Sequence, residues 1–381
     1  MRISYVSHLP IRIGKAHAIQ MMKMCQAMAM EGHDVRLIVP RYERMEKGHS
    51  NAAGFGEDYG ISCRFPVLEL GRKSVLSRVR FQYEAMRRSR GCGADLIYTR
   101  DVSTAALTSL SGIPTYLEVH QVPGGRVGPW YFRAALAGSG FRRLIVITQG
   151  LQHLLTEHHG RCLKGKSVIV APDGVDLERF ARLPVVADAA KELGADPLRF
   201  RVGYTGNLYG GRGIELILEL AKSFRDVEFW IIGGRPADVE HWRARARSFD
   251  IRNTKFWGYV PNALLPKYQA ACHVLLMPFE RQVAVSGGRG DTSAVMSPMK
   301  MFEYMATGRL IISSDLPVLR EVLSDRNAAL CPPDDVGAWI QALERARDDA
   351  VWRESRGAQA REDVQSYSWD RRVQRIFGSN I

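Results

Sequence analysis

The sequence has few features of a disulfide-rich, fibrous or membrane-spanning protein. Its six cysteines are spread over 381 residues, and no two have the spacing of a Cys-x-x-Cys motif. We therefore expect reduced, buried thiols and no structural zinc site. No apolar run reaches the roughly 18 residues that a membrane helix needs, and the 35 glycines and 17 prolines form no low-complexity segment. These absences are typical of a globular protein with a large core.

The first residues are also unlike a signal peptide. Residues 1–7 carry one charge and a short apolar stretch, and His8 and Pro10 follow directly. We expect a first strand that begins almost at residue 1 and a protein that stays in the cytoplasm.

Positive charge is concentrated in the first half of the chain. Residues 1–170 contain 24 Lys or Arg and 12 Asp or Glu, whereas residues 171–381 contain 29 and 28. A basic surface of this kind attracts nucleic acid, anionic lipid or anionic glycan. The chain contains no recognisable nucleic-acid-reading motif, so we expect no nucleic-acid partner.

Short apolar, β-branched segments alternate with helical patterns along the whole chain. They lie at residues 3–7, 34–39, 95–99, 116–119, 144–148 and 168–171, and again at 201–205, 228–232, 255–257, 274–277, 310–313 and 329–331. Strands of this kind separated by helices predict parallel sheets that are covered on both faces. A Pro-Asp-Gly turn at Pro172 ends the first series. The sequence thus predicts an α/β protein with two Rossmann-like domains, residues 1–172 and 173–365.

A glycine-rich loop follows the first strand of the second half. Gly206, Gly211 and Gly213 flank Arg212 there, and a helical pattern begins next. Glycines let backbone N–H groups approach a diphosphate, and an arginine can bind its oxygens with two hydrogen bonds. A flexible surface loop is the alternative, but the strand-loop-helix context favours phosphate binding. The earlier loop at Gly14 has one of the three glycines of a dinucleotide fingerprint, which excludes a standard NAD loop.

A second candidate ligand-binding segment begins at Ser297. Pro298 suits the first turn of a helix, and the free N–H groups of Met299 and Lys300 would face an incoming phosphate. Glu303, one turn further along, can accept hydrogen bonds from ribose hydroxyls. A buried, structural glutamate is the alternative interpretation.

His120 follows the apolar strand at residues 116–119. Ligands of open α/β sheets bind outside the carboxyl ends of the strands, and a histidine there can bind a sugar hydroxyl or act as a base. A purely structural histidine is an equal alternative.

Residues 297–308 and the segment after them, residues 311–322, resemble the donor-binding signature of glycosyltransferase family 4. Four further segments are similar to the same family in the expected order: residues 31–35, 170–176, 258–261 and 367–370. The resemblance implies the GT-B architecture, in which two facing Rossmann-like domains hold the active site in the cleft between them. It also implies a final helix, at about residues 366–381, that packs back on the first domain.

The resemblance implies roles for individual residues. Arg212 occupies the position of the family's phosphate-binding lysine, Gly14 lies in a loop near the donor phosphates, and His120 matches a histidine near the donor sugar. Donor-binding positions are implied at Gly14, Gly206, Asn207, Gly211, Tyr259, Val260, Ser297, Pro298, Met299 and Glu303.

Two positions depart from the family pattern. Asn207 stands where many members have an arginine, and Val295 stands at the first position of a Glu-x7-Glu motif that ends at Glu303. An asparagine supplies no charge, so Lys300 is the cation that we expect to compensate. Asp291, on the preceding loop, is the residue available to contact the donor sugar in place of Val295.

The family implies a retaining transfer from a nucleotide-diphosphate sugar without a cofactor or metal. The chain has no Asp-x-Asp pair, the cation-binding motif of the other large glycosyltransferase architecture. Arg212, Lys300 and helix N-termini would then stabilise the leaving diphosphate, and His120 would position the reactants. The implied acceptor is a glycan, a lipid-linked glycan or another hydroxyl compound, and bacterial cell-surface polysaccharide or glycolipid synthesis is the implied setting.

Residues 71–90 contain seven Lys or Arg and a single acidic residue, Glu84, with apolar residues between them. Such a helix can lie on an anionic membrane, which would make the protein peripheral on the inner face of the cell membrane. The alternative is a solvated helix whose apolar stripe faces the core.

Two other functions fit the same architecture. A sugar-nucleotide epimerase would keep the donor site and need no acceptor. A non-catalytic partner, which Asn207 and Val295 suggest, would bind nucleotide without turnover. The sequence leaves open the base and sugar of the donor, the acceptor, the linkage and the oligomeric state.

Overall fold

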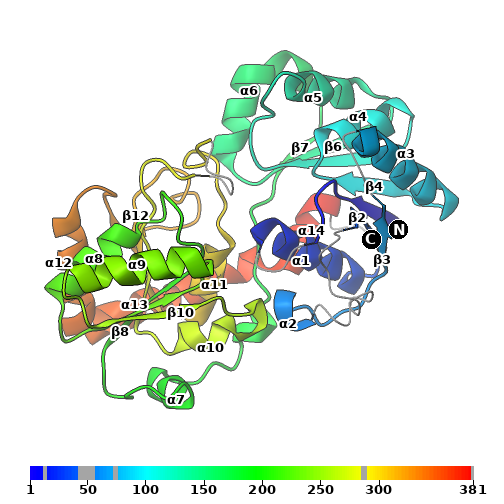
Figure 1. The fold of residues 1–381 in the computed structure, drawn as a ribbon. Coiled ribbons are helices and arrows are strands. Elements are labelled where there is room, and N and C mark those ends of the chain that lie inside the picture. The colour runs from blue at the N-terminus through cyan, green and yellow to red at the C-terminus, as the bar shows by residue number, and fades with distance from the viewer. Residues whose placement is uncertain (12–14, 42–55, 72–75, 285–289, 379–381) are drawn as a thin grey trace. The chain divides into compact units, whose positions relative to one another are not determined.

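The computed structural model describes residues 1–11, 15–41, 56–71, 76–284 and 290–378. The chain forms two compact units, of which the first comprises Met1–Pro172 with Trp369–Ile381 and the second Asp173–Ser368 (Figure 1). Each unit contains one sheet, and all strand pairs described in both sheets are parallel. The prediction of an α/β protein with two Rossmann-like parallel sheets is confirmed.

The first unit has a seven-stranded sheet of order β3-β2-β1-β4-β5-β6-β7. Its strands are β1 (Arg2–Val6), β2 (Asp34–Pro40), β3 (Val67–Leu70), β4 (Leu96–Thr99), β5 (Thr115–Val119), β6 (Phe141–Val146) and β7 (Val168–Val170). Its helices are α1 (Ala16–Met30), α2 (Gly56–Tyr59), α3 (Leu76–Gly91), α4 (Val102–Leu110), α5 (Gly128–Ala137), α6 (Gln149–Leu163) and α14 (Trp369–Phe377). Strand β3 was not predicted from the sequence, because this edge strand is half-buried and too short to give a clear apolar run.

The second unit has a six-stranded sheet of order β10-β9-β8-β11-β12-β13. Its strands are β8 (Arg201–Thr205), β9 (Glu228–Ile232), β10 (Thr254–Gly258), β11 (Val274–Met277), β12 (Leu310–Ser314) and β13 (Ala329–Cys331). Its helices are α7 (Val186–Glu192), α8 (Ile214–Ser223), α9 (Pro236–Ser248), α10 (Leu265–Ala270), α11 (Met299–Thr307), α12 (Val336–Asp348) and α13 (Ala350–Asp363). Short 3₁₀ turns lie at Leu177–Phe180, Asn262–Leu264 and Val364–Tyr367.

Strand β9 shows why both faces of the second sheet must be covered. Trp230 and Ile232 belong to one buried apolar cluster, whereas Phe229 and Ile231 belong to another. Since successive side chains of a strand point to opposite faces, each face of the sheet has its own core. This explains the unbroken apolar character of the strands in the sequence.

Helix α14 belongs to the first unit, where it packs on α1. Its buried residues Trp369, Arg372, Val373 and Ile376 recur at helical spacing and form a single stripe. Phe377, at its end, lies 5.4 Å from the ring of Tyr116 on β5.

All six cysteines are free. The expectation of buried thiols holds for Cys25, Cys272 and Cys331, whereas Cys63, Cys92 and Cys162 are partly exposed. In the described part of the chain, every helix is too short or too polar to span a bilayer.

Candidate functional site

Glycines shape the loop that joins β8 to α8 in the second unit. Gly206, Gly211 and Gly213 have φ angles of 144°, 82° and 68°, a region that L side chains rarely adopt. A Cβ on Gly211 would lie 2.4 Å from the carbonyl oxygen of Gln282, and one on Gly213 would lie 1.8 Å from that of Pro278. The loop therefore packs directly on the backbone that follows β11, and only glycine permits this approach.

Two cations lie beside this loop. The guanidinium of Arg212 and the ammonium of Lys300 each lie 5.3 Å from the ring centre of Phe279. The Lys300 ammonium also lies 3.9 Å from the ring centre of Tyr204, and Arg212 donates a hydrogen bond of 2.9 Å to the hydroxyl of Tyr209. Aromatic faces hold both cations in place.

Neither cation has a carboxylate partner among the described residues. Arg212 is half-buried, and its buried Nε has no hydrogen-bond partner there. Burial lowers the pKa of Lys300 well below its usual value, and the charge of Arg212 lowers that pKa further, while Glu303 acts in the opposite direction. Because buried donors and charges normally find partners, this pair can accept an anion.

Helix α11 begins next to these cations. Pro298 is its N-terminal cap residue, so the N–H groups of Met299 and Lys300 lie in the first turn, where a helix has no acceptor of its own for them. Tyr304 fixes the helix to β8, because its hydroxyl accepts the backbone N–H of Thr205 at 2.7 Å. The hydroxyl of Ser297 is buried and accepts the N–H of Asp173 at 3.0 Å.

Glu303 is buried in a network of amide groups. Its carboxylate oxygens accept hydrogen bonds from Asn262 at 3.3 Å and from Gln269 at 3.2 Å. The structural alternative for Glu303 therefore has direct support, while each oxygen retains a second lone pair for a ligand. Asn262 and Gln269 were not predicted from the sequence, because only packing brings them to α11.

Tyr259 and Val260 follow β10 and lead into the 3₁₀ turn that contains Asn262. Tyr259 is exposed and Val260 is half-buried. This order links the two residues to the Glu303 network through the chain, so they border the same end of the second sheet.

The residues that depart from the family pattern have structural partners. The backbone oxygen of Asn207 accepts the hydroxyl of Tyr204 at 2.6 Å, and Val295 is buried. The carboxylate of Asp291 accepts the backbone N–H groups of Val283 and Ser293, each at 2.9 Å. Although burial alone would raise the pKa of Asp291, these N–H donors lower it. Asp291 thus organises its own loop. Gly14 lies outside the described residues.

His120 lies in the first unit, directly after β5. Its Nε2 is 2.5 Å from a carboxylate oxygen of Glu118, which is fully buried. Glu118 also accepts hydrogen bonds from Gln20 at 2.8 Å and from the hydroxyl of Tyr98. The guanidinium of Arg372 on α14 lies 3.1 Å from the same carboxylate oxygen.

This network decides the charge of Glu118. Burial would raise the pKa of its carboxyl group, but the charge of Arg372 and the hydrogen bond to His120 together lower it well below the usual range. Glu118 is therefore a carboxylate, and it fixes one ring nitrogen of His120. Arg372 was not predicted from the sequence, because it stands far from Glu118 along the chain.

Comparisons with known proteins agree with this arrangement. The family model described as "Glycosyltransferase Family 4" matches residues 18–179, and "Glycosyl transferases group 1" matches residues 199–349. Sucrose-phosphate synthase from Thermosynechococcus elongatus has a similar fold, with a TM-score of 0.75 and 17% identity over 99% of this chain and 97% of that one. HepE of Anabaena in complex with UDP has a TM-score of 0.73 and 15% identity, over 100% and 99% of the two chains.

These likenesses define a protein of the GT-B fold class, with two Rossmann-like domains. Because the two family models together match both units, the chain belongs to glycosyltransferase family 4.

Three curated relatives are similar over part of their length. Phosphatidyl-myo-inositol mannosyltransferase of Mycolicibacterium smegmatis is 27% identical over 216 residues, which cover 54% of this chain and 49% of the relative. The 2-deoxystreptamine glucosyltransferase of Streptomyces kanamyceticus is 28% identical over 188 residues, 41% and 48% of the two chains. D-inositol 3-phosphate glycosyltransferase of Paenarthrobacter aurescens is 25% identical over 244 residues, 61% and 55%. The match thus spans about half of each relative.

Replacement of Arg372 by Met tests the Glu118 network. The variant removes the cation that acts most strongly on the buried carboxylate, and we expect it to lower the free energy of unfolding of the first unit by about 3–5 kcal/mol. Urea-induced unfolding of the full chain, followed by circular dichroism, measures the change. The matched control is Arg375→Met, an exposed position on the same helix. The double variant Glu118→Gln/Arg372→Met should recover part of the loss, and equal instability of the single and double variants would contradict the charge argument.

Proposed function

We propose that the chain is a retaining glycosyltransferase whose second unit binds a nucleotide-diphosphate sugar. The observation that carries this proposal is the pair of cations Arg212 and Lys300, which lie at a glycine loop and a helix N-terminus. Within the described residues, neither cation has a carboxylate as its partner. A diphosphate supplies the missing negative charge, and the loop glycines let backbone N–H groups approach it.

The same pair supports transfer without a metal. As the glycosidic bond to the donor breaks, negative charge develops on the leaving diphosphate, and Arg212, Lys300 and the first turn of α11 stabilise it. In a retaining transfer of this type, the departing phosphate takes the proton of the acceptor hydroxyl. For His120, held by Glu118 in the first unit, we keep the positioning role that the family resemblance implies.

Related proteins support the choice of donor and acceptor. HepE of Anabaena has been crystallised with UDP and with UDP-glucose, and we propose a nucleotide sugar as donor here. The inositol-specific relatives are named for acceptors that bear a phosphate. We propose a hydroxyl acceptor that binds the basic first unit. Its setting would be glycan or glycolipid synthesis at the bacterial cell surface.

Removal of the Arg212 side chain tests the donor site. Saturating UDP should raise the melting temperature of the wild type, because a ligand that binds only the folded state stabilises it. Arg212→Ala should weaken UDP binding by at least about tenfold, since a hydrogen bond to a charged group contributes about 1.5–3 kcal/mol. A thermal-shift titration measures this, with GDP and ADP as competitors for the base.

The control is Arg252→Ala, which removes an exposed arginine from the segment that leads into β10. If the Arg212 and Arg252 variants bound UDP equally strongly, Arg212 would not be part of the donor site. If none of the three nucleotides raised the melting temperature of the wild type, the donor proposal itself would fail.

Lys300 offers a separate test through its lowered pKa. A bound diphosphate favours the charged ammonium, so the pKa of Lys300 should rise on binding and the protein should take up a proton. Calorimetry of UDP binding in buffers of different ionisation enthalpy measures this uptake, at an alkaline pH where the phosphates of UDP are fully ionised. Lys300→Met should abolish the uptake, and Lys222→Met, at an exposed position on α8, should retain it. Uptake of the same size in Lys300→Met would assign the proton to another group.

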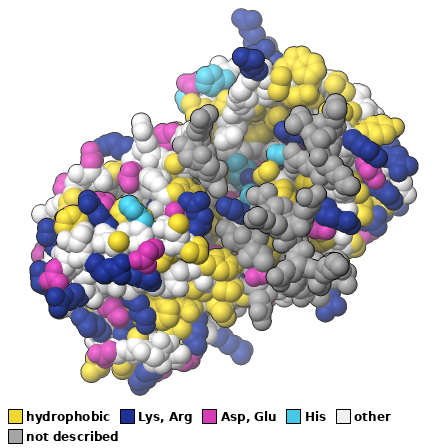
Figure 2. Space-filling model, viewed as in Figure 1, with side chains coloured by type: hydrophobic (Ala, Val, Ile, Leu, Met, Phe, Trp, Pro, Cys, Tyr) yellow, Lys and Arg dark blue, Asp and Glu magenta, His cyan; other side chains and the backbone are white. Residues whose placement is uncertain are grey.

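We also propose that α3 docks the first unit on an anionic membrane. Phe81 and Met86 face the core, as the structural alternative required, but Val79 and Tyr83 are 66% and 58% exposed. Arg80 and Arg87 are exposed on the same helix. Figure 2 shows dark-blue and yellow side chains together where Figure 1 places α3. An exposed aromatic residue among arginines suits a lipid surface.

Flotation with vesicles tests membrane docking. Each cation near an anionic surface contributes about 1 kcal/mol, so Arg80→Glu/Arg87→Glu should weaken binding to phosphatidylglycerol vesicles by more than about tenfold. The control, Arg225→Glu/Arg252→Glu, makes the same change in charge in the second unit. Equal losses in both variants, or binding that does not fall with added salt, would rule out α3 as the docking element.

A further inference from the structure

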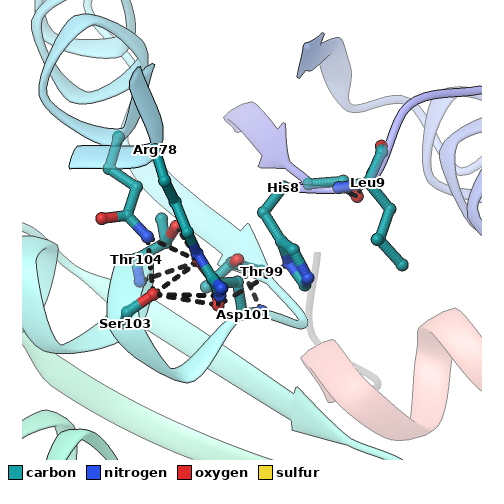
Figure 3. Close-up of polar contacts among 9 residues, drawn as sticks. His8, Leu9, Arg78, Thr99, Asp101, Ser103 and Thr104 are labelled. Carbon is teal, nitrogen blue, oxygen red and sulfur yellow. Dashed lines mark hydrogen bonds and ion pairs between the residues drawn. The ribbon is translucent and has the colours of Figure 1, made fainter. Parts of the chain in front are cut away.

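A second polar cluster lies in the first unit, around the buried carboxylate of Asp101 (Figure 3). Asp101 caps α4, because its side chain accepts the backbone N–H of Thr104 at 3.2 Å. It also accepts hydrogen bonds from the side chains of Gln82 at 2.8 Å, Ser103 at 2.9 Å and Thr104 at 2.7 Å. Helix capping needs one of these contacts, so Asp101 does more than cap α4.

Two further side chains approach the same carboxylate from different elements. Arg78 of α3 donates a hydrogen bond of 2.8 Å from Nη2 to Oδ1, and His8, which follows β1, has Nδ1 3.6 Å from the same oxygen. Figure 3 shows both side chains pointing at Asp101. Burial would raise the pKa of Asp101, but His8, Thr104 and Arg78 lower it to about 2. The carboxylate is therefore charged and holds both groups in place.

Arg78 is held by one end only. Among its contacts with the described residues, Nη2 donates to Asp101 at 2.8 Å and to Ser103 at 3.4 Å. Within the described residues, Nε and Nη1 make no hydrogen bond, and the side chain is 44% exposed. A guanidinium has five N–H donors in a rigid plane, so most of them remain available to a ligand. Asp101 itself is only 2% exposed and turns no lone pair toward solvent.

The place of the cluster in the sheet points to a substrate. His8 follows β1 and Asp101 follows β4, which are neighbours in the parallel sheet, and His120 follows β5, the next strand along. All three residues therefore lie at the carboxyl edge of the first sheet, where open α/β sheets bind ligands. A contact that only joined α3 to α4 would not require a half-exposed arginine at this edge.

We propose that Arg78 and His8, held by Asp101, form an anion subsite in the first unit that binds a phosphate group of the acceptor. This inference rests on the proposed transferase function and specifies its acceptor as a phosphate-bearing compound. The exposed edge of Arg78 matches two phosphate oxygens, and His8 lies beside the same oxygen of Asp101 that Arg78 contacts. The phosphate can belong to a soluble cyclitol or sugar phosphate or to a lipid headgroup.

Titration of the full-length protein with myo-inositol phosphate, compared with uncharged myo-inositol, tests the subsite. The readout is the NMR shift of the C2 proton of His8, which His8→Gln assigns. We expect the phosphate alone to bind and to shift this proton. Arg78→Met should weaken binding by at least about tenfold, because it removes charge-assisted hydrogen bonds. The matched control, Arg80→Met, removes the same charge from an exposed neighbour and should bind within about twofold of the wild type.

Three results would overturn the subsite. Equal weakening by Arg78→Met and Arg80→Met would show general attraction to a basic surface. If Arg78→Met bound inositol phosphate as strongly as the wild type and the His8 proton did not shift, the cluster would only link α3 to α4. If myo-inositol bound as strongly as its phosphate, the subsite would not recognise the phosphate group.

Two further measurements separate the remaining cases. Phosphatidylglycerol vesicles distinguish a lipid source, since membrane docking should fall in both arginine variants, whereas a phosphate held in the subsite depends on Arg78 alone. The UDP-induced rise in melting temperature, measured on every variant, confirms folding. It also separates the two proposals, because a wild type that binds UDP but no inositol phosphate contradicts the subsite and leaves the donor site intact.

Discussion

Parallel strand pairing is the constraint on which both candidate sites depend. Because every described pair in the two sheets is parallel, all strands of a sheet end at one edge, and the loops that follow them must share that edge. In the second unit this crowds the loops after β8, β9 and β11. A Cβ on Gly233 would lie 2.2 Å from the carbonyl oxygen of Gly206, so glycines are needed for the loops to fit. The N–H groups of Gly206 and Gly233 take part in this packing, since they donate to the carbonyl oxygens of Ile232 and Gly258.

Buried charge is balanced by an opposite charge in the first unit but not at the cations of the second unit. Glu118 is fully buried, and Arg372 of the same unit balances its charge. That pair joins α14 to β5, and it is complete without a ligand. Arg212 and Lys300 have aromatic partners but no carboxylate among the described residues. Since an isolated charge in a partly buried place is costly, an arrangement that keeps two of them is better explained by an anionic ligand than by stability.

The sequence predicted the features that local pattern encodes. Apolar strands and helical spacing gave both sheets, and the glycines beside Arg212 marked the loop after β8. Features set by long-range packing were not predictable. Nothing in the local sequence joins Arg372 to Glu118, or Asn262 and Gln269 to Glu303, because these contacts depend on how α14 and α10 pack. Edge strand β3 was missed because it is short and only half-buried, which weakens the apolar signal. The roles of His120, Glu303 and the other donor-site residues stay predictions.

The replacement of an expected arginine by Asn207 can be understood from the same packing. The backbone oxygen of Asn207 accepts the hydroxyl of Tyr204, and the ring of Tyr204 carries the Lys300 ammonium at 3.9 Å. A Cβ on Gly206 would lie 2.8 Å from that ammonium, so Gly206 leaves the space that Lys300 fills. The chain thus places one cation from α11, Lys300, beside the position where Asn207 supplies none. Because desolvation lowers the pKa of Lys300, its charged form gains most from an anion beside it, which is the role proposed for the donor diphosphate.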